Sequence, residues 1–317
     1  MKIAFHSTQL CVRGSSVAMY DYAHCNETIL FNKSVIVLLK EGLDKSDKQA
    51  LSRFQNRFEI LLYDKGDLDR VLITNKVNLL YCIKYGTNDN VFSTKIKTVV
   101  HCVFDMSQPH GDVYAGVSES LSKKFNSTLF VPHMIRLKPD LSNNLRQSLS
   151  IPENTTVFGR YGGMDTFDLT FCMDVIRNVV EARKDIFFLF INTPVFVNHK
   201  QVLFLENITE ERDKNAFIST CDAHLECGSL GHSFGLAIGE FSVHNKPIIA
   251  YKSKSLWNTC HLDILGNKGI YFETKDQFEN ILLTFDKKVY SSTDNNCYKN
   301  YSPTIVMNMF KSVFIDS

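Results

Sequence analysis

The sequence has no long apolar segment: no stretch approaches the roughly 18 consecutive apolar residues that a membrane-spanning helix needs. Residues 1–7 contain one Lys and a short apolar run without a cleavage site, so we expect no secretory signal. An excess of charge of one sign is also missing, because 35 Lys and Arg face 34 Asp and Glu, which argues against nucleic acid as a partner. With 15 Gly and 7 Pro among 317 residues, collagen-like and low-complexity classes are excluded. We therefore expect a globular protein of the cytoplasm, or of a host's cytoplasm if it is viral.

Several catalytic and metal-binding motifs are missing as well. The chain has no Gly-x-Gly-x-x-Gly after its first apolar run, no P-loop and no Gly-x-Ser-x-Gly, which argues against NAD enzymes, P-loop NTPases and α/β-hydrolases. None of the nine cysteines forms a Cys-x-x-Cys pair and most lie in apolar runs, so we expect free thiols in a reducing compartment. Asp67 and Asp69 form an Asp-x-Asp, but such short matches are common by chance, and we predict no metal site and no required cofactor.

Short apolar runs alternate with amphipathic stretches along the whole chain, which is typical of an α/β fold with parallel sheets covered on both faces. About six strands fall in each half, so we predict two Rossmann-like domains with parallel sheets facing across a cleft. The strands are expected at 3–5, 35–39, 79–83, 99–104, 114–117, 129–131, 156–159, 186–191, 202–205, 223–225, 248–250 and 269–272. The helices are expected at 15–28, 47–58, 168–182, 209–220, 236–244 and 276–285, among others.

A polar stretch with two prolines separates the two halves and is typical of a linker. We therefore predict an N-terminal domain over 1–135, a linker over 136–153 and a C-terminal domain over 154–297. Residues 298–317 follow the C-terminal domain.

Residues 221–251 carry the most informative pattern, which reads as strand, loop, helix, turn and strand. Small residues before the helix, Gly231 to Gly235, would let backbone N–H groups approach a ligand, and a helix start favours an anion such as a diphosphate. Glu240 follows one turn after Leu236, where a carboxylate could accept hydrogen bonds from the vicinal hydroxyls of a ribose. From spacing alone, a glycine-rich helix start with a solvated Glu is the favoured interpretation.

This segment resembles the donor-binding signature of the retaining GT-B glycosyltransferases of family four. That signature has two Glu residues separated by seven others around a Phe-Gly pair, followed by a strand of the type found here at 246–250. Phe234, Gly235 and Glu240 match it, whereas His232 stands at the first Glu position, which in the family contacts the transferred sugar. The resemblance implies a donor site at Ser233, Phe234, Gly235, Leu236 and Glu240, with His232 near the sugar.

Other segments resemble the same family and extend the resemblance over nearly the whole chain. Arg160 matches the Arg that clamps the diphosphate, although Asp165 stands where the family has a Lys. The strand ending at Thr193 and the strand ending at Glu206 match those that lead to the nucleotide. Near the amino end, the resemblance implies that Gly14 and Ser15 face the donor.

Two further features come from the resemblance. His101 stands where members carry a histidine near the reacting sugar, although a core histidine fits the sequence as well. The run from Phe158 to Asp168 resembles a closer group found in bacteria and large viruses.

The resemblance implies a metal-independent glycosyltransferase that retains the configuration of the transferred sugar. The C-terminal domain would bind a nucleotide-sugar donor, with UDP or GDP as the nucleotide, and the N-terminal domain would bind a glycan or another hydroxyl acceptor. Residues 298–317 would form a helix that crosses back to the N-terminal domain. His101, His232 and Glu240 would be the catalytic residues. Because His232 and Asp165 depart from the family's pattern, the alternative is an inactive relative that binds a nucleotide or glycan without transfer.

Overall fold

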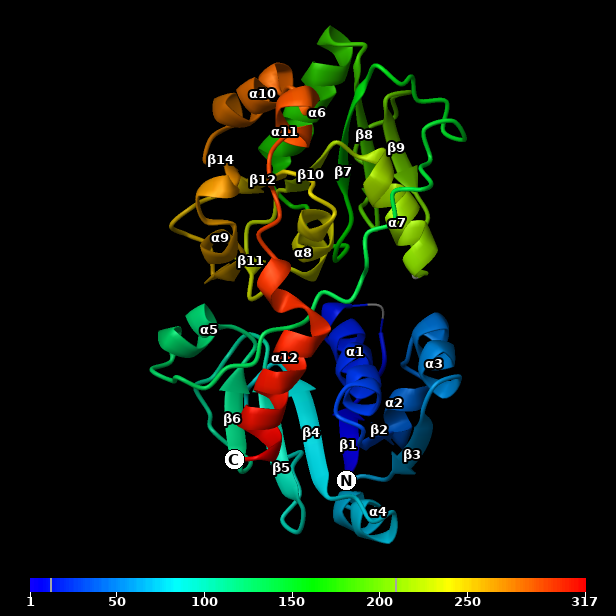
Figure 1. Ribbon diagram of the computed structural model, residues 1–317, viewed down its shortest axis with the longest axis vertical. Helices are drawn as coiled ribbons and strands as arrows, with labels where there is room; N and C mark the ends of the chain where they lie inside the picture. The colour runs from blue at the N-terminus through cyan, green and yellow to red at the C-terminus, as the bar shows by residue number, and fades with distance from the viewer. Residues whose placement is uncertain (12, 209) are drawn as a thin grey trace. The chain divides into compact units, whose positions relative to one another are not determined.

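The computed structural model describes residues 1–11, 13–208 and 210–317. The chain divides into two compact units, an N-terminal unit of Met1–Arg136 with Tyr301–Ser317, and a C-terminal unit of Leu137–Asn300. Each unit contains a six-stranded parallel sheet with helices against it (Figure 1). This is the α/β architecture predicted from the alternation of apolar runs and amphipathic stretches, and the prediction of about six strands in each half is confirmed.

The sheet of the N-terminal unit has the order β3-β2-β1-β4-β5-β6. Its middle strands are apolar and buried throughout, as in Val35–Leu38, because helices cover both faces. The strands are β1 (Lys2–Ser7), β2 (Lys33–Leu39), β3 (Glu59–Tyr63), β4 (Leu79–Lys84), β5 (Lys97–Cys102) and β6 (Val113–Gly116). The helices are α1 (Gly14–Thr28), α2 (Lys40–Leu43), α3 (Lys48–Gln55), α4 (Leu68–Thr74), α5 (Glu119–Lys124) and α12 (Pro303–Phe310), which continues into the single π-turn η3 (Lys311–Ile315).

The sheet of the C-terminal unit has the order β14-β12-β10-β7-β8-β9. The strands are β7 (Thr156–Arg160), β8 (Ile186–Ile191), β9 (Val202–Leu205), β10 (Ala223–Glu226), β12 (Ile248–Tyr251) and β14 (Ile270–Phe272), and β11 (Gly231–His232) pairs with β13 (Asn258–Thr259) in a small separate sheet. The helices are α6 (Thr170–Ala182), α7 (Glu211–Thr220), α8 (Leu236–Val243), α9 (Cys260–Leu265), α10 (Lys275–Thr284) and α11 (Lys287–Ser291), with short 3-10 turns η1 (Gly266–Lys268) and η2 (Lys299–Tyr301), whose last residue belongs to the N-terminal unit.

Three elements differ from the expectation. The strand expected at 129–131 is only a bridge of Phe130 with Gly116, and two backbone hydrogen bonds at that point replace a ladder. The prediction missed β3, although residues 60–63 form a short apolar run; this edge strand is only partly buried. The helix expected at 209–220 begins at Glu211 as α7, and Thr209 lies outside the described residues.

The stretch expected as a linker belongs mostly to the C-terminal unit, which begins at Leu137. Residues 137–153 contain no helix or strand. The buried Arg146 fixes them, since its guanidinium lies 2.9 Å from the Asp222 carboxylate and donates to the Thr155 carbonyl at 3.1 Å. The segment is therefore packed structure and not a free tether.

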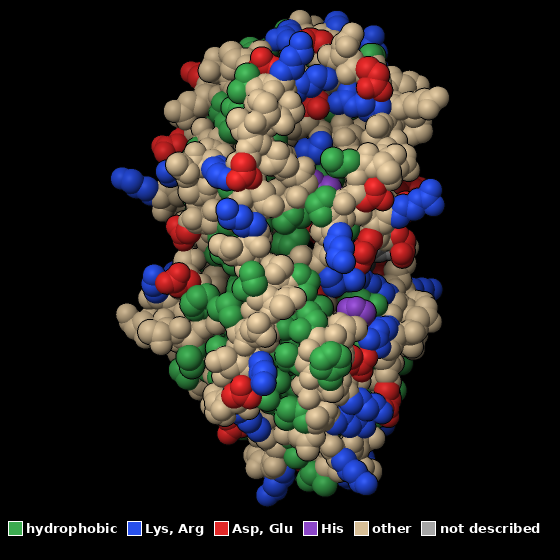
Figure 2. Space-filling model, viewed as in Figure 1, with side chains coloured by type: hydrophobic (Ala, Val, Ile, Leu, Met, Phe, Trp, Pro, Cys, Tyr) green, Lys and Arg blue, Asp and Glu red, His purple; other side chains and the backbone are tan. Residues whose placement is uncertain are grey.

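The surface and the thiols agree with the composition. Lys and Arg side chains alternate with Asp and Glu over the visible face, as the net charge of +1 suggests (Figure 2). All nine cysteines lie within the described residues, none of them forms a disulfide there, and seven are buried. In the described part of the chain, no helix combines the length and apolar character needed to cross a membrane.

Candidate functional site

The C-terminal sheet has a topological switch point between β7 and β10. These strands are neighbours, but the chain continues from β7 to β8 and β9 on one side and from β10 to β12 and β14 on the other. The loops that follow two such strands separate, and ligands of open α/β sheets bind in the crevice left at their carboxyl ends. Arg160 ends β7 and Glu226 ends β10, so two charged residues mark this point.

Arg160 is almost completely enclosed by the protein. Its guanidinium donates to the carbonyls of Asn192 (3.0 Å) and Gly163 (2.6 Å) and to the hydroxyls of Thr193 and Thr166. Only 1% of the residue is exposed, and burial lowers the pKa of the guanidinium. The arrangement differs from the expected diphosphate clamp: Arg160 and Thr193 tie the ends of β7 and β8 together, and the guanidinium faces carbonyls and hydroxyls of the chain itself.

Residues of the run from Phe158 to Asp168 surround the Arg160 guanidinium. After Arg160 the chain returns through Gly163 and Thr166, which accept its hydrogen bonds. Asp168 then accepts from the Ser229 backbone N–H at 2.8 Å and from the Ser229 hydroxyl, so the loops after β7 and β10 are joined. The run therefore shapes the switch point.

α8 begins beside this point, at the small residues that the sequence singled out. Gly235 has φ 87° and ψ 68°, a left-handed backbone conformation that favours glycine, whereas a Cβ there would lie 3.1 Å from Ile238 Cδ1, which could shift. Ser233 and Phe234 are buried before it, and Leu236 is the first helical residue. The first N–H groups of a helix lack intrahelical acceptors and carry the positive end of its dipole, so this start can bind an anion.

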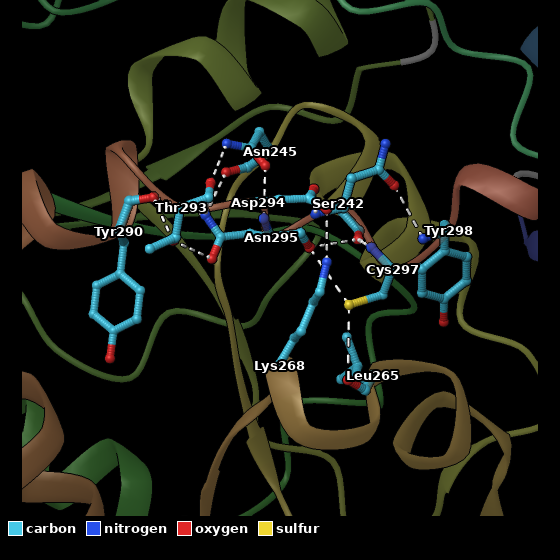
Figure 3. Close-up of polar contacts among 11 residues, drawn as sticks. Ser242, Asn245, Leu265, Lys268, Tyr290, Thr293, Asp294, Asn295, Cys297 and Tyr298 are labelled. Carbon is cyan, nitrogen blue, oxygen red and sulfur yellow. Dashed lines mark hydrogen bonds and ion pairs between the residues drawn. The ribbon is translucent and has the colours of Figure 1, made fainter.

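Hydrogen bonds connect the end of α8 with the segment before Tyr298 (Figure 3), and Tyr298 contacts the loop that starts α8. The Tyr298 hydroxyl donates to the Phe234 carbonyl at 2.8 Å, and the two rings pack edge to face. The segment before Tyr298 is attached to the end of α8, because the Asn295 amide donates to the Asn245 carbonyl and the Cys297 N–H donates to Ser242 Oγ. The loop that starts α8 is therefore braced by a segment more than 60 residues later in the chain, since Phe234 and Tyr298 are 64 residues apart.

Glu240 lies on α8 one turn after its start and is buried. Its carboxylate accepts from Lys214 Nζ of α7 at 3.0 and 3.3 Å and from the Tyr161 hydroxyl, which follows β7. Burial, and after it the Glu240 carboxylate, raises the pKa of the Tyr161 phenol. The solvated Glu allowed by the spacing is thus wrong: the carboxylate is held beside the switch point by a cation and a hydroxyl.

His232 contacts a carboxylate that the sequence did not single out. Its Nε2 lies 3.0 Å from Oε2 of Glu226, whose side chain is 7% exposed, whereas a quarter of the His232 side chain remains exposed. The His224 Nε2 lies 3.8 Å from the same oxygen, and the His261 ring packs edge to face on His232. Burial works to lower the pKa of His232, but the Glu226 carboxylate outweighs it and raises the pKa above the ordinary value.

Glu206, Gly14 and Ser15 have simpler surroundings. Glu206 directly follows β9 and is exposed. Gly14 is exposed and Ser15 half-buried in the first turn of α1, after the carboxyl end of β1 in the N-terminal unit.

His101 belongs to the core of the N-terminal unit. Its Nε2 donates to the Val131 carbonyl at 2.7 Å, and its Nδ1 lies 2.7 Å from the Tyr81 hydroxyl. The residue has no exposed surface, and burial lowers its pKa to about 4. Both ring nitrogens are occupied, so the geometry favours the core-histidine interpretation over contact with a substrate.

Sequence reasoning missed Tyr161, Lys214 and Glu226. The Lys214–Glu240 contact joins two helices and has no signature in spacing. Glu226 left a usable signal, because it is a carboxylate at the carboxyl end of a strand, the edge where parallel sheets bind ligands. In the described ranges no group of three or more His, Cys, Asp or Glu side chains is arranged to hold a metal ion. The hollow of about 940 Å³ near Lys97, Asp112 and Ser317 lies at the amino ends of β5 and β6, away from any switch point.

Comparison with known proteins identifies the fold. No protein-family profile matches the chain, and no curated protein matches its sequence. Among solved structures, HepE from Anabaena in complex with UDP-glucose aligns with a TM-score of 0.74 at 13% identity, over 98% of this chain and 99% of that one. A glycosyltransferase from Rickettsia africae aligns with a TM-score of 0.68 at 12% identity, over 100% and 99%. A putative UDP-N-acetylglucosamine 2-epimerase from Listeria monocytogenes aligns with 0.61 at 12% identity, over 100% and 97%. The fold is therefore the GT-B fold, as the resemblance implied.

Proposed function

We propose that this protein is a glycosyltransferase that moves a sugar from a UDP-sugar to a hydroxyl of its acceptor. The observation that carries the proposal is the start of α8 beside the β7–β10 switch point, with the buried Glu240 one turn further on. Structures of the same fold in complex with UDP-glucose and with UDP support UDP over GDP.

Within this proposal the backbone from Ser233 to Leu236 binds the diphosphate, because a helix start presents N–H donors to an anion. Glu240 binds the ribose hydroxyls, and Lys214 and Tyr161 hold its carboxylate ready. Residues near Thr193 and Glu206 contact the base. The N-terminal unit binds the acceptor, with Gly14 and Ser15 toward the donor.

The reaction proceeds with retention and without a metal ion. The bond between the anomeric carbon and the diphosphate oxygen breaks while the acceptor oxygen bonds to the same face of that carbon. The acceptor's proton passes to the leaving diphosphate oxygen, so no side chain needs to act as base. The amide donors at the start of α8 stabilise the negative charge that develops on the diphosphate, and they do so without reorganising.

The second candidate is a protein that binds a UDP-sugar without transferring it. Two observations favour it: the Arg160 guanidinium is enclosed by the chain, and His232 replaces the family's sugar-contacting Glu. Both candidates share the donor site and differ only in turnover.

The first experiment is a thermal-shift panel of UDP, GDP, ADP, TDP and their sugar conjugates. A ligand at 100 times its dissociation constant adds about 2.7 kcal/mol of stability, which a melting curve detects. We expect UDP and one UDP-sugar to raise the melting temperature and Glu240→Gln to weaken uridine and UDP alike. A panel without any shift would overturn the proposed donor site.

The second experiment follows the sugar by NMR when that UDP-sugar is incubated with candidate acceptors. A product with the anomeric configuration of the donor supports retaining transfer, and an inverted product contradicts it. Binding without turnover supports the second candidate. A donor returned with an altered sugar carbon would assign the epimerase chemistry named for one of the aligned structures.

A further inference from the structure

The Glu226 carboxylate is a buried charge that the proposed function does not yet use. It ends β10, a central strand, and only 7% of its side chain is exposed. Removing a carboxylate from water is costly unless it is paired and hydrogen-bonded. Here one oxygen accepts from the Gly228 N–H at 3.1 Å, and the other lies 3.0 Å from His232 Nε2. The pairing with His232 therefore compensates the buried charge.

The surroundings of the pair make His232 its principal cation. The titratable and charged groups that face His232 are Glu226 and His224 from β10, His261 from α9 and Arg160 from β7. Burial lowers the pKa of both His224 and His261, which keeps these two rings neutral. Against burial, which would raise it, the nearby imidazoles hold the pKa of Glu226 well below its ordinary value, with His232 the largest of these influences.

The geometry also fixes which edge of His232 is available. Nε2 is buried 3.0 Å from the Glu226 carboxylate, an ion-pair contact without hydrogen-bond geometry, yet a quarter of the side chain is exposed, so the accessible surface belongs to the rest of the ring and to Cβ. His232 immediately precedes Ser233 and the loop that starts α8. Because the His232 ring contacts Glu226 through Nε2, its other nitrogen, Nδ1, lies on a different side of the ring from Glu226.

We propose that Glu226 is a positioning residue of the donor site, whose carboxylate holds His232 by Nε2 as a cation so that the ring's opposite edge binds the diphosphate of a nucleotide-sugar. This inference rests on the proposed donor site and goes beyond it. The resemblance places a Glu at position 232, toward the sugar. In this chain the Glu226 carboxylate, six positions earlier, instead stabilises the protonated His232 ring. A cationic ring favours contact with phosphate oxygens.

The pair is tested first without any nucleotide. The Cε1–H resonance of His232, assigned by its loss in His232→Gln, is titrated by NMR in the wild type and in Glu226→Gln. We expect the His232 pKa to lie above its ordinary value in the wild type and to fall below it in Glu226→Gln, because burial and the nearby Arg160 charge, which both lower it, are then unopposed. Glu273→Gln, a change at an exposed carboxylate just after β14, serves as the matched control and should leave the titration unchanged. Equal pKa values in the wild type and Glu226→Gln would overturn the pairing.

The second test measures binding of UDP-glucose and of uridine by calorimetry between pH 6 and pH 8. UDP-glucose is chosen because its esterified diphosphate keeps its charge over this range. We expect wild-type affinity for UDP-glucose to fall as pH rises through the His232 pKa. In Glu226→Gln the affinity for UDP-glucose should be about tenfold weaker at pH 7 and independent of pH. The neutral His232 ring can then no longer make a charge-assisted hydrogen bond to a phosphate oxygen. Uridine should bind both proteins equally.

A double variant separates positioning from simple loss of structure. If Glu226 acts through His232, Glu226→Gln should have no further effect on UDP-glucose affinity in a His232→Gln background. Full additivity would overturn the positioning role. A wild type that binds neither UDP-glucose nor uridine would refute the proposed function, whereas the NMR titration would still decide the Glu226–His232 pair.

Discussion

At the scale of single residues, the candidate site depends on carboxylates kept charged inside the protein. The Glu240 side chain is 11% exposed and that of Lys214 is 17% exposed, so both ions have lost most of their hydration. Their attraction, with the Tyr161 hydroxyl as a further donor, offsets that loss. A ribose that approaches Glu240 meets an acceptor already fixed in orientation, which reduces the entropy lost on binding.

Lys214→Met should therefore destabilise the protein by about 2 kcal/mol, between the values for surface and fully buried ion pairs, because it leaves a buried carboxylate unpaired. Glu240→Gln in the same background should recover part of this loss, since the unpaired charge is gone. Urea unfolding of the two single variants and the double variant measures the coupling. Lys275→Met, an exposed lysine on α10, is the control and should change stability little. Additive effects of the two substitutions would contradict the pair.

At the scale of elements, the irregular segment around Asn295 connects parts of the chain through side-chain hydrogen bonds, a role that backbone hydrogen bonds have in helices and strands. Asn295 is buried after α11, and its side-chain NH2 group donates to the carbonyls of Asn245 (3.1 Å), Tyr290 (2.8 Å) and Thr293 (3.3 Å). Its neighbour Asn296 uses its side chain differently, because its amide oxygen accepts from the Tyr298 N–H at 3.1 Å. One asparagine is needed as a donor and the next as an acceptor (Figure 3 shows the segment).

This difference gives a matched pair of substitutions. Asn295→Asp should cost about 3 kcal/mol or more, since it turns a buried carboxylate toward three carbonyl oxygens, although the Tyr290 carbonyl still accepts from Thr293 and the Thr293 carbonyl from Asn245. Asn296→Asp should be tolerated within about 0.5 kcal/mol, since the carboxylate still accepts the same hydrogen bond. Thermal and urea unfolding of the two variants provide the comparison. The idea that this segment braces the start of α8 also requires Asn295→Asp to weaken UDP binding at temperatures where the protein stays folded.

The elements also show how far the sequence alone could lead. A run such as Ile186–Ile191 is apolar and fully buried, so its pattern predicts a central strand directly, whereas β3 is partly exposed and was missed. The turn at Gly235 and the spacing to Glu240 were readable because both are local. The contacts of Arg160 with Gly163 and Thr166 are local too, but whether a guanidinium faces a ligand or the chain's own carbonyls depends on how the loops close. The same holds for the pairing of Lys214 with Glu240 across two helices.

At the scale of the whole molecule, buried histidines make stability depend on pH. Burial lowers the pKa of His6 and of His101 to about 4 and that of His261 to about 3. In the unfolded chain these side chains take up protons near pH 6.5. The unfolded state therefore binds more protons than the folded state between pH 6.5 and about 4, and stability falls as the pH is lowered through this window. His232 acts in the opposite direction, because its pKa is raised and its contribution is lost as the pH increases.

The free energy of unfolding should consequently be lower at pH 5 than at pH 7, with each histidine of pKa about 4 contributing about 2 kcal/mol to the difference. His6 provides the sharpest test, because its Nε2 lies 2.7 Å from the Tyr63 hydroxyl and a Gln can keep that hydrogen bond without titrating. His6→Gln should reduce the difference between pH 5 and pH 7 by about 2 kcal/mol, as measured by urea unfolding with circular dichroism. His199→Gln, at a half-buried position outside the core, should leave the pH dependence as it is. If His6→Gln and His199→Gln changed it equally, the loss of stability in acid would have to come from carboxylates, whose protonation lies at lower pH, and the buried rings would not be its cause.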